Sequence, residues 1–312
     1  MIDQPKKKRT GTINLFHSSS WKQFFFYARY MLRSMLRKQP DPLIYGIALT
    51  DRCNLACKGC HVSNTGRRDM VWEELLAAMQ NAWERGFREL YFTGGEPMLW
   101  HDASHTLSNV IAAAKRIGFF HVHVYTNGLL GLDSPADLMW VSMDGLPGVF
   151  EQRRGDHFHE VEAIVRSAQH PKIAVNYVID RNTAKGIEPF LRWVRDTHLP
   201  VLGVMFYFHT PYYGRDDLFL TTEERAPIID HLLKFIQDGL PVINSRAGLL
   251  ALRSGNWQRR SPIAAVVDVD GESVCCRAAD EVCPDCGYGA CTELTEILRL
   301  RPSTILGMLR YL

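Results

Sequence analysis

The sequence predicts an α/β fold, an open partial (β/α)6 barrel, and two observations carry this prediction. From residue 43 onward, short apolar runs alternate with longer amphipathic stretches of helical periodicity. The apolar runs are nearly continuous, which is typical of parallel strands covered by helices. Six such units are visible in the 312 residues, which is too few to close an eight-stranded barrel.

The expected strands and helices alternate along the chain. The expected strands are residues 44–49, 89–93, 122–126, 139–143, 173–179 and 202–208. The expected helices lie near residues 70–85, 103–117, 159–169, 184–196 and 221–238. Folds of this class place their functional side chains at the C-terminal ends of the strands, so we expect the site in the motifs that follow each strand.

Composition divides the chain into three segments. Gly and Pro residues interrupt the barrel pattern between residues 240 and 262. We therefore expect a basic amphipathic segment at 1–42, the barrel core at 43–245 and a small cysteine-rich extension at 246–312. Residues 1–38 carry nine Lys and Arg side chains against a single acid, whereas the remainder has a net charge of −6. Basic arms of this kind commonly meet an anionic surface.

A helix is expected over residues 21–37, where apolar residues recur at helical spacing. Lys22, Arg29, Arg33 and Arg37 fall on the opposite side. A basic amphipathic helix with aromatic residues can lie in a membrane interface, and the alternative is a helix packed on the body with its basic face in solvent. The apolar positions are Trp21, Phe24, Phe25, Ala28, Met31, Leu32, Met35 and Leu36.

The sequence also predicts the compartment. No apolar run approaches the ~18 residues that a transmembrane helix needs, and the basic start has no apolar region of a secretory signal behind it. We expect a cytoplasmic protein, with association at the inner membrane face as one alternative. The eight cysteines of such a protein favour metal chemistry over disulfides, and they gather in two groups.

The first group is Cys53, Cys57 and Cys60, spaced C-x3-C-x2-C directly after the first expected strand. Three thiolates on one short loop can hold three irons of a [4Fe–4S] cluster and leave the fourth iron open for a ligand. A zinc ion with His61 as fourth ligand is the alternative.

A glycine turn, Gly94-Gly95-Glu96-Pro97, follows the second expected strand. Paired glycines let the backbone approach a ligand closely, and Pro97 stiffens the exit from the turn. Glu96 offers a carboxylate to a ligand amine. The turn lies at the same end of the barrel as the cysteine loop, so the two motifs together favour one site.

Taken with residues 126–128 (Thr-Asn-Gly) and 142–145 (Ser-Met-Asp-Gly), these motifs make the chain resemble the radical S-adenosylmethionine (radical SAM) superfamily over residues 43–210. The resemblance implies that the open iron chelates the amino and carboxylate groups of S-adenosylmethionine (SAM). An electron from the cluster then cleaves the sulfonium, giving methionine and a 5′-deoxyadenosyl radical. It also implies a reducing partner such as flavodoxin or ferredoxin, and no nucleic-acid partner.

The same resemblance implies which residues bind SAM. Gly94, Gly95 and Glu96 contact the methionine amine, and residues 175–178 line the adenine. The complete set of expected cofactor contacts is Gly94, Gly95, Glu96, Pro97, Asn127, Ser142, Asp144 and Asn176.

One residue departs from the family pattern. The position before the third cysteine is usually aromatic, but here it is Gly59, as in a subset that includes the adenosylhopane synthases. The chain partly resembles that subset in its basic amphipathic leader, its turn at residues 126–130 and its late cysteine-rich tail.

The second group of cysteines lies in the C-terminal extension at Cys275, Cys276, Cys283, Cys286 and Cys291. The spacing suits an auxiliary Fe–S cluster, with Cys276 favoured over Cys275 as the fourth ligand. A zinc knuckle and reduced bystander cysteines remain alternatives.

The rim of the barrel offers further candidates. His209, Tyr212 and Tyr213 follow the sixth expected strand and could position a substrate, or form an ordinary polar loop. Arg153 and Arg154 follow the fourth expected strand, and a role at a helix end is as well supported for them as a catalytic one.

The resemblance implies a radical SAM enzyme, a transferase or an oxidoreductase, acting on an unactivated carbon or an alkene. The basic helix and the adenosylhopane synthase likeness favour an isoprenoid or other lipid substrate. A peptide substrate, as for maturases with cysteine-rich tails, is the alternative, and a non-catalytic Fe–S electron carrier is a distant one.

Overall fold

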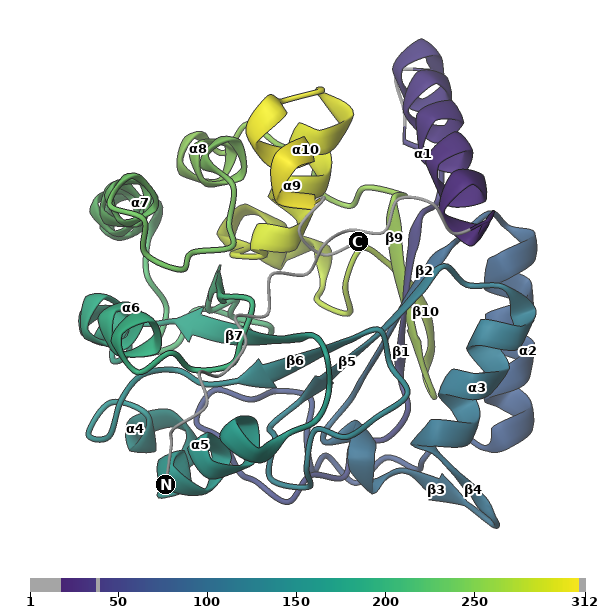
Figure 1. Ribbon diagram of the computed structural model, residues 1–312, viewed down its shortest axis with the longest axis horizontal. Helices are drawn as coiled ribbons and strands as arrows, with labels where there is room; N and C mark the ends of the chain where they lie inside the picture. Colours follow the sequence, from purple (N-terminus) through teal and green to yellow (C-terminus); the bar gives the residue numbers. More distant parts are fainter. Residues whose placement is uncertain (1–17, 38–39, 309–312) are drawn as a thin grey trace, which may run out of the picture.

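The computed structural model describes residues 18–37 and 40–308. Its centre is a curved eight-stranded sheet in the order β10-β9-β1-β2-β5-β6-β7-β8, with helices on its outer side (Figure 1). Every neighbouring pair is parallel except β9 and β10. The sheet does not close on itself, so the predicted open partial barrel is confirmed.

The strands of the large sheet are mostly buried, as the continuous apolar runs predicted. They are β1 (Ile44–Ala48), β2 (Glu89–Thr93), β5 (His121–Thr126), β6 (Leu138–Ser142), β7 (Ile173–Ile179), β8 (Val204–Phe208), β9 (Ala264–Asp268) and β10 (Gly271–Val274). Two short strands, β3 (His101–Asp102) and β4 (His105–Thr106), form a separate hairpin. The helix expected near 103–117 begins only at residue 107, because the hairpin occupies the residues before it.

The α-helices are α1 (Ser18–Arg37), α2 (Trp72–Glu84), α3 (Leu107–Ile117), α4 (Glu151–Arg154), α5 (Phe158–Ser167), α6 (Ile187–Asp196), α7 (Thr222–Gln237), α8 (Arg246–Ser254), α9 (Gly289–Leu298) and α10 (Pro302–Met308). Three short 3-10 helices are η1 (Pro97–Leu99), η2 (Ala184–Gly186) and η3 (Asp280–Asp285). Local sequence sets several of the ends. The Thr221 hydroxyl accepts the Glu224 N–H at the start of α7, and α3 stops at Gly118, whose φ of 117° suits glycine.

The core has two layers because the sheet is covered on both faces. The larger layer packs the outer face of the sheet against the helices, with Phe92, Val124, Phe190 and Phe206 buried in it. A smaller layer on the inner face joins strand residues such as Trp140 and Met205 to the C-terminal extension. The extension therefore contributes to the interior of the barrel.

The strands β9 and β10 come from the C-terminal extension and were not predicted. β9 pairs with β1 in parallel, Ile44 opposite Ala264, so the extension lengthens the sheet at its β1 edge. At the other edge the backbone N–H of Phe208, the last residue of β8, donates to the carbonyl of Gly287 at 3.0 Å. The extension thus spans from one edge of the sheet to the other, on its inner side (Figure 1).

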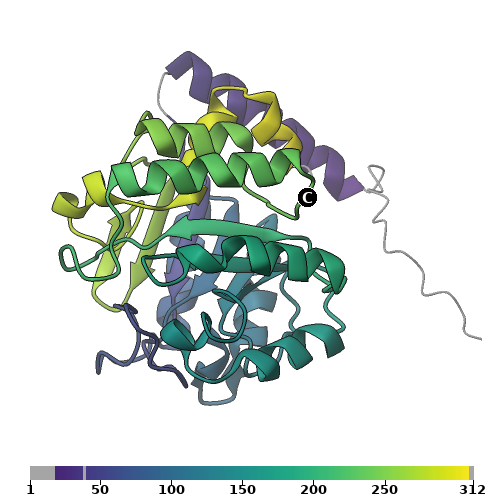
Figure 2. The same ribbon diagram turned by 90° about the vertical axis from the view of Figure 1, so that its left-hand side faces the viewer.

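The N-terminal helix α1 lies on the outside of the fold beside α9 (Figure 2). It packs through Phe26, Tyr27, Tyr30 and Met31, which meet a small cluster that includes Leu43 and Ile263. This is not the expected apolar stripe. The exposed side chains of α1 are instead Trp21, Phe24, Phe25, Leu32 and Leu36, which are 50–75% exposed. The helix therefore has two apolar faces, and the body covers only one of them.

The described residues hold no helix that combines the length and the hydropathy needed to cross a membrane.

Candidate functional site

The cysteine loop leaves β1 at the C-terminal end of the sheet. Cys53, Cys57 and Cys60 are half-buried, and none forms a disulfide. A turn in which the Cys60 N–H donates to the Cys57 carbonyl at 3.1 Å brings the last two cysteines onto one side. The sequence thus places three thiols on one loop, as its spacing predicts.

Each of these three sulfur atoms accepts a hydrogen bond. The Leu55 N–H donates to Cys53 Sγ at 3.4 Å, and the Ser63 hydroxyl donates to Cys60 Sγ at 3.2 Å. Arg154 Nη1 lies 3.8 Å from Cys57 Sγ. Burial raises the pKa of the Cys57 thiol, while the Arg154 charge acts in the opposite direction. Donors and a cation aimed at sulfur suit thiolates that bind metal, because they stabilise the charged form.

The three sulfurs are not arranged as the ligands of a single ion. Thiolate ligands of a zinc ion lie ~2.3 Å from the metal and so within about 4 Å of each other. Among the described residues, the only three His, Cys, Asp or Glu ligand atoms that all lie within 4.8 Å of one another come from His61, His209 and Asp216. The sulfurs of Cys53, Cys57 and Cys60 therefore do not all lie within 4.8 Å of one another.

Packing explains the glycine that replaces the usual aromatic residue. Gly59 has φ of 72°, and a Cβ atom there would lie 2.4 Å from Leu218 Cδ1 and 3.2 Å from His209 Cε1. The loop after β8 therefore occupies the space beside the third cysteine, where a larger side chain would clash.

The glycine turn lies directly against the start of the cysteine loop. A Cβ on Gly94 would meet the Thr50 carbonyl at 2.2 Å, and one on Gly95 would meet the Arg52 carbonyl at 2.3 Å. The Gly95 N–H donates to the Thr50 carbonyl at 2.8 Å. Both glycines are thus required by the close approach of two backbones, before any ligand is considered.

Glu96 is completely buried and its carboxylate holds two loops together. It accepts hydrogen bonds from the Thr126 hydroxyl at 2.8 Å and from the backbone N–H groups of Asn127 at 2.7 Å and Met98 at 3.1 Å. Burial raises the pKa of Glu96, and these three donors act against the rise. The buried Pro97 follows it at the start of η1. Glu96 therefore positions the turn after β2 against the loop after β5.

The remaining predicted cofactor contacts lie at the ends of neighbouring strands. Asn127 Nδ2 donates to Asn54 Oδ1 at 2.7 Å, which fixes it against the cysteine loop. Ser142 and Asn176 are opposite each other in the register of β6 and β7. Asn176 Oδ1 is buried and has no hydrogen-bond partner among the described residues, so an acceptor is available for a ligand at this point.

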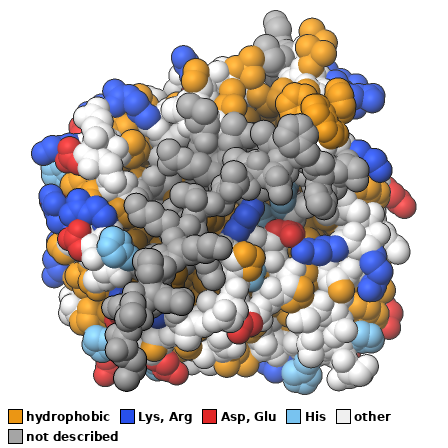
Figure 3. Space-filling view, viewed as in Figure 1, with side chains coloured by type: hydrophobic (Ala, Val, Ile, Leu, Met, Phe, Trp, Pro, Cys, Tyr) orange, Lys and Arg blue, Asp and Glu red, His pale blue; other side chains and the backbone are white. Residues whose placement is uncertain are grey.

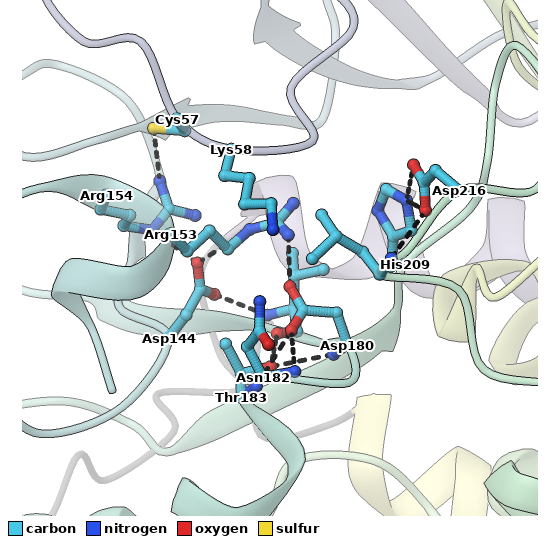
Figure 4. A network of polar contacts seen from close by, with 12 residues as sticks. Cys57, Lys58, Asp144, Arg153, Arg154, Asp180, Asn182, Thr183, His209 and Asp216 are labelled. Carbon is cyan, nitrogen blue, oxygen red and sulfur yellow. Dashed lines mark hydrogen bonds and ion pairs between the residues drawn. The ribbon is translucent and has the colours of Figure 1, made fainter. Parts of the chain in front are cut away.

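A buried network of charges joins Asp144 to the cysteine loop (Figure 4). Asp144 is completely buried, and its carboxylate lies 2.6 Å from Arg154 Nε and 3.3 Å from Arg153 Nε. Arg153 Nη1 pairs with Asp180 at 2.6 Å. The sequence left Arg153 and Arg154 undecided between a helix end and the site. The structure brings both into the site, because α4 turns them back under the cysteine loop.

The C-terminal cysteines gather in the extension, near the end of β8. Cys275 Sγ lies 3.6 Å from Cys291 Sγ, and Arg260 Nη1 lies 3.8 Å from Cys276 Sγ. Cys283 is in η3, and burial raises the pKa of the Cys286 thiol to about 12. Arg259 and Arg225 donate to the carbonyls of Cys283 and Cys286 at 2.8 Å and 3.0 Å. All five cysteines are half-buried and without disulfides.

Part of the chain is similar to known proteins. Residues 47–166 match the Radical SAM superfamily. The chain is 28% identical over 169 residues to a probable GTP 3′,8-cyclase of Sulfolobus acidocaldarius, covering 49% of this chain and 52% of that protein. It is 27% identical over 194 residues to the PqqA peptide cyclase of Xanthomonas axonopodis pv. citri, covering 56% and 49%. The chain thus spans about half the length of these curated relatives.

Solved structures share the fold. SuiB of Streptococcus suis bound to its precursor peptide SuiA has a TM-score of 0.58 at 12% identity, covering 80% of this chain and 62% of that one. The structure of anSMEcpe with bound AdoMet and Kp18Cys peptide has a TM-score of 0.53 at 18% identity, covering 69% and 67%. At these identities the likeness concerns the fold alone. The match of residues 47–166 to the Radical SAM superfamily agrees with this shared fold.

Proposed function

We propose that the chain binds SAM at a [4Fe–4S] cluster held by Cys53, Cys57 and Cys60 and cleaves it reductively. The observation that carries the proposal is the set of three thiols on one loop, each sulfur with its own hydrogen-bond donor. When bound, the cluster supplies the electron that splits the sulfonium into methionine and a 5′-deoxyadenosyl radical. A flavodoxin or ferredoxin is the proposed electron donor.

The polar groups around the loop suit the parts of SAM. The backbone of Gly94, Gly95 and Glu96 faces the methionine amine in this proposal, because the Glu96 carboxylate is already bonded to Thr126, Asn127 and Met98. Arg154, beside Cys57, is the cation available to the methionine carboxylate. The other proposed contacts are Pro97, Asn127, Ser142, Asp144 and Asn176.

SAM cleavage by the anaerobically reconstituted protein tests the proposal. With dithionite as reductant, wild-type protein should release 5′-deoxyadenosine, and the Cys53→Ala/Cys57→Ala/Cys60→Ala variant should not. A matched control is Arg166→Ala/Arg192→Ala/Arg195→Ala, which changes three partly exposed side chains of α5 and α6. Undiminished 5′-deoxyadenosine from the triple variant would refute the proposed cluster ligands.

We propose an auxiliary Fe–S cluster in the extension, with Cys276, Cys283, Cys286 and Cys291 as ligands. Arginines near the sulfur of Cys276 and the carbonyls of Cys283 and Cys286 support it, since they compensate the charge of bound thiolates. The contact between Cys275 and Cys291 makes Cys275 the alternative fourth ligand. Reconstituted protein should hold about eight irons. Four irons without zinc would leave these cysteines as bystanders, and zinc would support a knuckle.

We propose that the substrate is an isoprenoid or other lipid, met at the inner face of the membrane. The support is the uncovered apolar face of α1, where hydrophobic side chains gather at the top right of Figure 3. The exposed Lys22, Arg29, Arg33 and Arg37 border this face. Apolar side chains flanked by cations suit the interface of an anionic bilayer. The basic residues 6–9 lie outside the described residues.

A peptide substrate is the second candidate, and the comparisons favour it. One of the relatives is named a peptide cyclase, and both of the solved structures above hold a peptide. Within the extension, Tyr288 and Ala290 pack on the inner side of the sheet, and we propose that this part of the chain forms part of the substrate entrance.

One measurement separates the two candidates. Protein, SAM and dithionite are incubated anaerobically with a lipid extract, and the products are analysed by mass spectrometry. A lipid that gains adenosyl, or that is altered while 5′-deoxyadenosine is released, supports the lipid substrate and distinguishes addition from hydrogen abstraction. SAM cleavage that no lipid stimulates would favour the peptide.

A further inference from the structure

Three side chains that lie far apart in the sequence meet where β8 ends. His61 follows the cysteine loop, His209 follows the last residue of β8, and Asp216 lies in the loop between β8 and α7. One nitrogen of each imidazole and one carboxylate oxygen all lie within 4.8 Å of one another. Figure 4 shows His209 and Asp216 directed toward each other beside the Lys58 segment of the cysteine loop.

The three side chains are arranged like the ligands of a metal ion, and one of them, His61, makes no hydrogen bond through its Nε2 among the described residues. His209 Nε2 lies 2.9 Å from Asp216 Oδ2, and His61 Nε2 lies 3.8 Å from the same oxygen. His61 Nε2 is buried and has no hydrogen-bond partner among the described residues. His209 and Asp216 alone would be enough to hold the loop in place. The buried His61 nitrogen without a hydrogen-bond partner adds nothing to that structural role.

The carboxylate is held in position by the backbone. The N–H groups of Leu218 and Phe219 donate to Asp216 Oδ1 at 3.0 Å and 3.1 Å, and Oδ2 makes the shorter of the two contacts with His209 Nε2. His209 is 4% exposed and belongs to the end of a strand. Ligands fixed by rigid elements and by hydrogen bonds to their second atoms are what a metal site requires.

We propose that His61 Nε2, His209 Nε2 and Asp216 Oδ2 bind a divalent transition-metal ion. Two imidazoles and one carboxylate suit zinc or iron(II) and leave coordination positions open. The ion replaces the direct contact of His209 Nε2 with Asp216 Oδ2. Tyr213 packs edge-on against His61 with ring centroids 5.2 Å apart and is itself 81% exposed, so the site lies near solvent. The open positions would hold an oxygen of the substrate, and this last step rests on the proposed function.

Cobalt(II) binding to the anaerobically reconstituted protein tests the site without SAM or reductant. Isothermal titration should give one Co²⁺ site that His61→Ala weakens at least tenfold and Asp216→Asn weakens similarly. X-ray absorption of the bound Co²⁺ should show nitrogen and oxygen neighbours. The matched control is His157→Ala, a partly exposed histidine at the start of α5, which should bind as wild type.

The outcomes are distinct. Binding that His61→Ala leaves unchanged, or sulfur neighbours in the absorption spectrum, would overturn the site and point to the cysteines. Asp216→Asn also changes the hydrogen bonds that hold the loop after β8. If Asp216→Asn unfolds the protein, the result with His61→Ala decides the test. Loss of SAM cleavage in the cysteine triple variant with Co²⁺ binding retained would show that this site and the proposed cluster stand independently.

Discussion

Arg154 directs its guanidinium at Cys57, although 97 residues separate them in the sequence: Nη1 lies 3.8 Å from the sulfur while Nε pairs with buried Asp144 at 2.6 Å. The cation is almost fully buried, so water screens it little. A positive charge beside a cluster ligand stabilises the reduced, more negative state of the cluster. Asp144 sits on the far side of the guanidinium and limits this effect.

Arg154→Gln should therefore lower the reduction potential of the proposed cluster. We expect a shift of the order of 50 mV, the equivalent of about tenfold in a one-electron equilibrium. Redox titration followed by electron paramagnetic resonance measures it. Removing one partner of a buried ion pair also costs about 3–5 kcal/mol of stability, so the variant is examined at low temperature.

Asp144→Asn gives the opposite test of the same relationship. Loss of the carboxylate leaves Arg154 unopposed beside Cys57, so the potential should rise. The double variant should recover part of the stability lost by Arg154→Gln, because no unpaired charge remains buried. Equal potentials in all four proteins would mean that Arg154 has a structural role only.

Gly59→Ala tests the packing that replaces the usual aromatic residue. The left-handed φ of 72° and the contact with Leu218 Cδ1 should together cost about 1–3 kcal/mol of unfolding free energy. Urea unfolding measures the loss. Adding Leu218→Ala should remove the steric part of the cost and leave the part caused by φ. If the double variant loses as much unfolding free energy as the two single variants together, the clash does not exist in solution.

The sequence predicted most of the fold because each barrel strand is a local apolar run. All six predicted strands are present, within two residues at their ends, and so are the helices between them. β9 escaped prediction for a physical reason. Its sequence, Ala-Ala-Val-Val-Asp, has only two residues that favour strands, and it becomes a strand by pairing with β1, some 220 residues earlier.

The site was predicted to the extent that it follows strand ends. The cysteine loop and the glycine turn are contiguous motifs, whereas Arg154 enters the site through the path of α4. The contact of His61 with Asp216 depends on tertiary structure in the same way. The packing face of α1 was not predictable either, because the helix is apolar on two sides and only the body decides which one it covers.

His123, on β5, should make stability fall as the solution becomes acidic. Burial lowers the pKa of His123 to about 4 from an ordinary 6.5, so between these values the unfolded chain binds a proton that the folded protein does not. The free energy of unfolding is therefore highest above pH 6.5, and protonation of His123 lowers it by roughly 3 kcal/mol as the pH falls toward 4. His123→Gln should flatten the dependence of unfolding free energy on pH in that window.

His121, two residues earlier, is the matched control. Burial alone would lower its pKa, but the hydrogen bond and charge of Glu89 raise it above 6.5. Protonated His121 therefore stabilises the folded protein fully below pH 6.5. This stabilisation is lost as the pH rises through the raised pKa of His121. His121→Gln should change the slope of unfolding free energy against pH in the direction opposite to that caused by His123→Gln. Identical slopes in both variants would contradict the neutral state of His123.

The uncovered face of α1 should bind anionic membranes. Each basic residue near such a surface contributes ~1 kcal/mol, and salt screens it. Sedimentation with vesicles of anionic lipid should therefore weaken as ionic strength rises, and should fall at least tenfold for Arg29→Glu/Arg33→Glu/Arg37→Glu. Trp21→Ser/Phe25→Ser/Leu32→Ser should reduce binding at every salt concentration, since it removes apolar side chains that are at least half exposed.

Charge reversal on another helix separates docking from a general effect of net charge. Arg166→Glu/Arg192→Glu/Arg195→Glu changes three partly exposed arginines of α5 and α6 by the same amount. If α1 is the docking surface, this variant should sediment nearly as wild type while the α1 variants stay in solution. Arg33 and Arg37 also pair with Asp41, so circular dichroism must first establish that α1 still folds. Equal loss in both charge variants would mean that net charge alone drives binding, and the lipid substrate would then lose its main structural support.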